Sequence, residues 1–249
     1  MHSLNEKTAI DSGDLALTVE QKNWLISLSG HLAMQNGEGL ESLNMATEEK
    51  PYLVNSYTKM LAGSYGVSSK EELISTLDRF CHTQTSALFM ACLNEFIRPD
   101  LLATYLSEDR SNTYQNTPMG IKSGWAEIHR MALSRCGIRA FDIGRYAFLC
   151  RCGVTVNILT EAEAWQYLVR IGKLAQTLFD SWHNFAASYV VGRCVWQDIE
   201  VKEYNYQPGQ DFDFSYDLDQ KIEKATAILQ TILADDDHPW CQLEWKMAF

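Results

Sequence analysis

The chain has 249 residues, 46% of them hydrophobic, which suits one helical core with an appended tail better than two equal domains. Its formal charge is −11, with 32 acidic residues against 21 Lys and Arg, and it has no basic run that would follow a phosphate backbone. We therefore expect no nucleic-acid partner, and the lack of an early apolar segment or a membrane-length apolar stretch predicts a cytoplasmic protein without membrane contact.

Helix starts are marked by Ser or Thr followed three residues later by Glu or Gln, a reciprocal cap that satisfies the free amides of a first turn. The pairs are Thr18 with Gln21, Ser68 with Glu71, Ser69 with Glu72, and Thr160 with Glu163. The first predicted helix spans about 19–35 and stops at Asn36-Gly37. Residues 37–56 are predicted as a loop, 57–61 as the start of a short helix, and 70–96 as a capped helix.

The polar stretch 107–117 predicts an exposed connection, and five further helices are expected, near 119–135, 138–152, 161–179, 182–199 and 217–234. Strand alternation is scarce, so the predicted fold is all-α, a single irregular multi-helix domain with short non-helical N- and C-terminal tails. The N-terminal tail is 1–17 and the domain 18–249, with a looser half 18–106, a motif-bearing core 118–200, and a C-terminal helix and tail 212–249. The aromatic side chains of Trp240 and Trp245 are expected to pin residues 235–249 onto the body.

Seven Cys, an odd number placed mainly in apolar helical stretches, predict buried reduced thiols rather than a disulfide framework. The six His show neither helical i, i+4 spacing nor an adjacent Cys-x-x-Cys, so no zinc site is predicted. The run Asp235–His238 offers oxygen ligands for a divalent cation, but a charge run at a helix end is usually only solvated. We expect no metal and no cofactor.

Two apolar stripes carry charged residues toward the interior. In 138–152 the stripe contains Asp142 and Arg145, and in 182–196 the stripe that includes Trp182 ends with Arg193 and Trp196. A buried guanidinium without a partner costs roughly several kcal/mol, so the fold must supply carboxylates or carbonyls to these groups, and Asp142 is the local candidate.

Two glutamates offer a further partner for these arginines. Glu161 and Glu163 lie in the first turn of the next helix, which a short loop packs antiparallel to the preceding one. The sequence therefore predicts a buried ionic cluster of Asp142, Arg145, Arg193 and one of the two glutamates.

The cluster has two interpretations. It is either a polar network that fixes helix packing, or a site in which Asp142 or Glu163 acts as general acid or base while Arg145 and Arg193 hold an anion. Glu163 has a simpler alternative role, because the third residue of a capped helix can turn back to the amide of Thr160.

Three sequence blocks resemble the bacterial domain-of-unknown-function family 1266: an aromatic-Asp-x-Gly-Arg helix, an acidic capped helix ending in Trp, and a Ser-Trp helix closing with Gly-Arg and Trp. They are Ile138–Arg145, Leu159–Trp165 and Ser181–Trp196, with looser similarity at Trp24, Ser27 and Tyr65–Leu73. Phe141 stands where the family usually has Trp, and Cys81-His82 only partly matches a Gly-His pair. The resemblance covers roughly residues 20–200 and Pro239-Trp240, and it implies fold and compartment but no reaction.

The first functional hypothesis is a non-enzymatic interaction module, an adaptor or immunity-type antagonist that binds a protein partner, for which the acidic charge favours a basic protein. The binding candidates are Arg145, Arg193, Glu161, Trp182 and Trp196. The acidic charge and the lack of catalytic spacing motivate it. The alternative is an enzyme or toxin domain that uses the Asp/Glu/Arg cluster for acid-base chemistry or anion binding.

Overall fold

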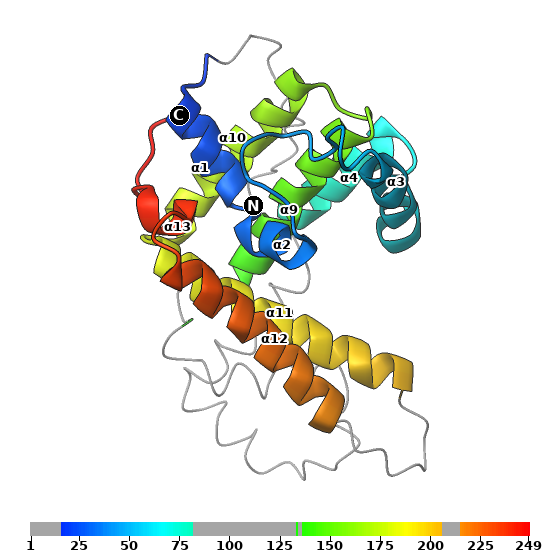
Figure 1. Cartoon of the computed structure of the whole chain (residues 1–249), viewed down its shortest axis with the longest axis vertical. Coiled ribbons are helices and arrows are strands. Elements are labelled where there is room, and N and C mark those ends of the chain that lie inside the picture. The colour runs from blue at the N-terminus through cyan, green and yellow to red at the C-terminus, as the bar shows by residue number, and fades with distance from the viewer. Residues whose placement is uncertain (1–15, 82–132, 134–135, 206–214) are drawn as a thin grey trace, which may run out of the picture.

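The computed structural model describes residues 16–81, 133, 136–205 and 215–249 (Figure 1). All regular structure in these ranges is helical, which confirms the predicted all-α class. The first helices are α1 (Val19–Ser27), α2 (Gly30–Asn36), α3 (Tyr52–Tyr65) and α4 (Lys70–Cys81). They are followed by α9 (Arg139–Thr155), α10 (Glu161–Leu178), α11 (Trp182–Asn205), α12 (Ser215–Ala234) and α13 (Pro239–Gln242). The predicted connection 107–117, the helix 119–135 and the end of the 70–96 helix fall outside the described residues.

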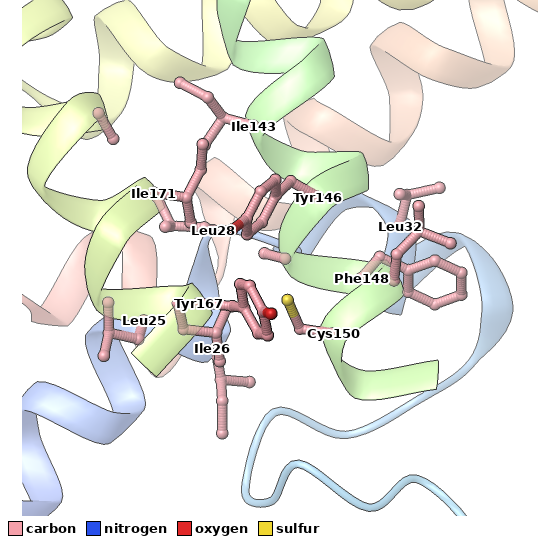
Figure 2. Close-up of a cluster of buried hydrophobic side chains, with 14 of the residues drawn as sticks. Leu25, Ile26, Leu28, Leu32, Ile143, Tyr146, Phe148, Cys150, Tyr167 and Ile171 are labelled. Carbon is pink, nitrogen blue, oxygen red and sulfur yellow. The ribbon is translucent and has the colours of Figure 1, made fainter. Parts of the chain in front are cut away.

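Helix α9 is the centre of the fold and contacts α1, α2, α3, α4, α10 and α11. All its residues are buried except Arg139 and Arg145. The prediction of a single apolar stripe was therefore too narrow, because a helix covered on every side buries its whole circumference. Figure 2 shows Tyr146 and Cys150 of α9 packed among apolar side chains from α1 and α10, including Leu25, Ile26, Tyr167 and Ile171.

Helices α9 and α11 approach closely where each carries a glycine. A methyl group on Gly144 would lie 2.6 Å from the Tyr189 ring, and one on Gly192 would lie 2.5 Å from Phe141 Cβ. Beside this contact Ser188 of α11 donates to the Gly137 carbonyl at 2.7 Å and accepts from the Ala140 amide. The hydroxyl thus satisfies backbone groups at the start of α9 and ties the two helices together.

The predicted helix starts at Thr18, Ser69 and Thr160 are confirmed. Thr18 and Thr160 form complete capping boxes, and the Glu72 carboxylate accepts from the amides of Ser68 and Ser69. A helix cap depends only on residues within one turn of each other, so it can be predicted from the sequence.

The prediction of one helix over 19–35 was wrong, because the chain bends at Leu28-Ser29 and begins α2 at Gly30. The Ser27 carbonyl accepts the Trp240 indole N–H at 2.7 Å, a partner more than two hundred residues away. The predicted end at Gly37 is confirmed, with φ 69° in the left-handed region.

Helix α3 begins earlier than predicted, at Tyr52. Pro51 precedes it with φ −67°, a value already suited to a helix start. Helix α11 extends beyond the predicted 199 to Asn205 and lies alongside α12 (Figure 1). No helix in the described part of the chain is long and apolar enough to cross a bilayer.

The C-terminal segment, residues 235–249, is pinned by aromatic side chains as predicted, although it contains the short helix α13 and is not wholly non-helical. Trp245 donates its indole N–H to the Phe179 carbonyl at 2.8 Å. The indole N–H groups of Trp24 and Trp182, which belong to the body, donate to the carbonyls of Glu244 and Leu243 in the segment. Each buried indole N–H therefore has an acceptor, which fixes the segment on the body.

The described cysteines are all free. Four of them are buried as predicted, namely Cys136, Cys150, Cys152 and Cys194. Cys81 is half-buried and Cys241 is exposed.

Candidate functional site

Part of the predicted ionic cluster forms at the start of α9. The Arg145 guanidinium donates to Asp142 at 2.5 Å, and Arg139, which the sequence reasoning did not select, lies 3.8 Å from the same carboxylate. Arg145 also lies over the rings of Phe80 and Phe141, at 4.5 and 4.1 Å from their centroids. Asp142 is only 1% exposed, so the group resembles a buried structural ion pair more than an open site.

Arg193 faces Trp196, with its guanidinium carbon 4.9 Å from the ring centroid. Both Arg193 and Arg145 lie near the phenol of Tyr189, and their positive charges favour its ionised form. Burial outweighs them and raises the pKa of Tyr189 above its ordinary value. Arg193 was predicted to join the ion pair of Asp142 and Arg145, but its contact is the Trp196 ring, and it shares with Arg145 only an electrostatic effect on Tyr189.

The predicted inclusion of a glutamate was wrong. Glu163 pairs with Lys70 of α4 and accepts from the Thr160 amide, while Glu161 is exposed. The antiparallel packing of α10 places these residues beside the end of α9, about 20 Å of helix rise from Asp142. The hydrogen bonds from Lys70 and Thr160 lower the pKa of Glu163, the wrong direction for a general acid at neutral pH.

Trp182, a predicted binding residue, is buried in the aromatic core under the C-terminal segment. Its ring stacks on Trp240 with centroids 5.7 Å apart, and its N–H donates to the Leu243 carbonyl. Trp196 is half-buried and contacts Phe141 as well as Arg193. Both tryptophans have packing roles that account for their positions.

Arg151 is a buried charge that the sequence reasoning missed, with 1% exposure in α9. Its guanidinium donates to the carbonyls of Gly39 and Ser42, at 2.6 and 3.2 Å, and to the Ser29 hydroxyl. The arginine thereby fixes the loop after α2. Its charge is satisfied by carbonyl oxygens, with no carboxylate in direct contact.

A cleft of about 580 Å³ opens between that loop and the connection from α12 to α13. Met34, Leu40 and Pro239 supply its apolar surface, and Gly37 faces open space, since a methyl group there would meet nothing within 4 Å. The volume lies within the range of small-ligand pockets.

Acidic residues line two walls of the cleft. Glu38 and Glu41 belong to the loop after α2, and Asp235 and Asp237 to the opposite connection. Among the described lining residues, every formal charge at neutral pH is negative. Lys50 does not line the cleft, and its ammonium donates to the Gly37 carbonyl at 2.8 Å. No grouping of His, Cys, Asp and Glu in the described residues suits a metal ion.

Glu38 is placed by the end of α2. Because Gly37 adopts the left-handed conformation, the Glu38 amide donates back to the Ala33 carbonyl at 2.9 Å. Both carboxylate oxygens are buried, and neither has a well-formed hydrogen bond. Burial raises the pKa of Glu38 despite the positive charges of Arg151 and Lys50 and the nearby Asn36 amide.

His238 presents an unpaired nitrogen at the opposite wall, where its side chain is 6% exposed. Its Nδ1 accepts from the Trp240 amide at 3.1 Å and caps α13, so in the neutral ring Nε2 carries the proton. Burial lowers the pKa of His238 and keeps it neutral, and Nε2 is buried without a partner. The lining of the cleft thus includes two buried polar groups of opposite kind, the Glu38 carboxylate and the His238 Nε2 donor.

The fold and these sites define an all-α protein with a buried central helix, an internal ion pair and a separate acid-lined cleft. The chain belongs to the family described as "Protein of unknown function (DUF1266)", whose model matches residues 60–245. This confirms the resemblance, although the match begins later than residue 20 and extends through α12 and much of the C-terminal segment. Glu38 and Glu41 lie before it.

Two Escherichia coli K12 proteins are similar to this chain. The uncharacterized protein YbeR is 26% identical over 189 residues, which cover 74% of this chain and 75% of the relative. The uncharacterized protein YbeU is 23% identical over 194 residues, 75% of each chain. No solved structure matches the chain.

Proposed function

We propose that this protein is a non-enzymatic protein-protein interaction module, an adaptor or immunity-type antagonist, whose acid-lined cleft receives a basic segment of its partner. The observation that carries the proposal is the charge of the cleft: its formally charged lining residues are acidic, from both walls, in a pocket large enough for a ligand.

The Glu38 carboxylate strengthens this interpretation. The burial of this carboxylate is only partly offset by Asn36, Arg151 and Lys50, and a cation that enters the cleft would offset more of that cost. Binding would therefore be favoured both by direct attraction and by the release of an unfavourable state. Attraction to a basic protein would also accelerate association and weaken with added salt.

The enzyme alternative rests on Asp142, Arg145 and Arg193. Asp142 is buried and contacted by two arginines, an environment that holds a carboxylate as a structural counterion. Glu163 serves as a helix cap and as a partner of Lys70. Those contacts support a packing role, so the interaction module is the better-supported proposal.

Site-specific photo-crosslinking in the cells that produce the protein tests this function. A photoreactive residue at Asn23, which lines the cleft, should capture one basic protein, whereas the same residue at the exposed Glu71 of α4 should not. The double variant D235N/D237N should lose the crosslink. Capture at Glu71 alone, or persistence of the crosslink in the double variant, would overturn the proposal, as would substrate turnover in an activity screen.

A further inference from the structure

We propose that the group received by the cleft is an arginine side chain of a partner protein, held in an extended segment, with Glu38 binding the guanidinium and His238 Nε2 donating to a carbonyl oxygen of the same segment. This inference rests on the proposed function and specifies its ligand. It is carried by the cleft, its two acidic walls and two buried polar groups of opposite kind.

The arrangement of the acids favours a guanidinium over an ammonium. Carboxylates stand on both walls, Glu38 and Glu41 on one and Asp235 and Asp237 on the other. A guanidinium presents a planar fork of N–H donors that can engage carboxylates on different sides at once, whereas an ammonium is a compact point charge.

The cost of desolvation also favours a guanidinium over an ammonium. The Glu38 oxygens are buried, so a cation must shed water to reach them. A guanidinium is more weakly hydrated than an ammonium and loses less on entry. The apolar surface from Met34, Leu40 and Pro239 can pack against the planar face and the aliphatic stem of the arginine.

His238 accounts for the need for a peptide rather than a free cation. Its Nε2–H is a donor, so a guanidinium cannot satisfy it, but the carbonyl of an extended backbone can. Gly30 lies against this ring, since a methyl group there would approach His238 and Trp240 at 3.3 and 3.0 Å. The histidine is therefore held in place by packing as well as by its bond to the Trp240 amide.

Isothermal titration of the full chain with four probes tests the inference: a blocked pentapeptide Gly-Ser-Arg-Ser-Gly, the same peptide with Lys or citrulline in place of Arg, and methylguanidinium. The Arg peptide should bind, and the neutral citrulline peptide, of matched shape, should lose binding about tenfold or more. The Lys peptide should also be weaker than the Arg peptide.

Two variants separate the contacts. E38Q should weaken both the Arg peptide and methylguanidinium about tenfold, while E71Q on α4 should change neither. H238N keeps a residue that can cap α13 but removes the Nε2 donor. It should weaken the Arg peptide about threefold to tenfold and leave methylguanidinium unchanged.

Equal affinity for the Arg and Lys peptides, both lost in E38Q, would overturn the arginine inference and leave the interaction proposal standing. Citrulline binding as tight as arginine, or Arg-peptide binding unaffected by E38Q in a folded variant, would also overturn the inference. If no basic peptide binds and crosslinking at Asn23 captures no basic partner, both proposals fail.

Discussion

The ion pair at the start of α9 and the acid-lined cleft differ in the partners that they give to a buried carboxylate. At Asp142 the carboxylate is buried and held by Arg139 and Arg145, with aromatic rings packed against the latter. At Glu38 the carboxylate is also buried, but its oxygens have no well-formed hydrogen bond. The Asp142 carboxylate is paired directly with arginines, whereas Arg151, Lys50 and Asn36 only partly offset the burial of Glu38, so a further cation would be favoured there.

The largest expected effect comes from breaking the matched pair. D142N replaces the carboxylate with a neutral amide of nearly the same shape, which weakens its pairing with the guanidinium groups of Arg139 and Arg145. We expect the free energy of unfolding to fall by about 3 to 5 kcal/mol, measured by urea denaturation. The control D78N breaks the exposed Asp78–Arg170 pair and should cost about 1 kcal/mol or less. Equal effects would contradict the distinction.

Folding stability should also depend on pH through His31, a buried neutral ring on which the charge of Arg193 acts. Its Nε2–H donates to the Ala225 carbonyl, and burial lowers its pKa from 6.5 to about 4. The unfolded chain therefore binds a proton first, and stability falls by about 3 kcal/mol as pH drops from 6.5 to about 4.

H31F should flatten that part of the stability profile, measured by urea denaturation at several pH values, while H183Q at an exposed position of α11 should leave it unchanged. A profile with the same slope in H31F would assign the pH dependence to other groups.

The effect of removing Arg193 should be smaller than that of breaking the Asp142 pair, because its clearest contact is the Trp196 ring. R193M keeps much of the stem and should cost about 1 kcal/mol, the size of a partly exposed cation-π contact. Thermal and urea unfolding give the value. A loss of about 3 kcal/mol or more would mean that Arg193 neutralises a buried carboxylate, as the sequence pattern suggested.

The smallest change in the free energy of unfolding, a gain instead of a loss, is expected for a substitution in the cleft. The raised pKa of Glu38 means that ionisation disfavours the folded state, so stability falls as pH rises through and above 4.5. E38Q should raise stability at neutral pH by a few tenths to about 1 kcal/mol, allowing for partial exposure, and the gain should vanish in acid. A destabilised E38Q protein would show that the carboxylate is already well paired.

The sequence predicted the features that depend on local contacts. The capping boxes at Thr18 and Thr160 and the pairing of Asp142 with Arg145 one turn later are all encoded within a few residues. The glutamate assignment failed because it depended on which end of α9 the next helix would meet. A short loop brings the start of α10 to the end of α9, far from Asp142.

The cleft was missed because its walls lie about two hundred residues apart in the chain. Glu38 follows a helix-ending glycine, a local signal that fixes its position but does not reveal what lies opposite. The acidic run Asp235–His238 predicts only a solvated helix end, and its place beside α2 depends on the hydrogen bond from Trp240 to Ser27. Nothing in the sequence pattern connects these two segments.

The pKa of the Glu38 side chain, measured by carbon NMR of its carboxyl group with and without the Arg pentapeptide, tests the account most directly. In the free protein we predict a value above 4.5, because the carboxyl is buried and poorly paired. The peptide should bring that value down, since a guanidinium beside the carboxylate stabilises its ionised form. An ordinary pKa in the free protein, or one that the bound peptide leaves unchanged, would contradict the account.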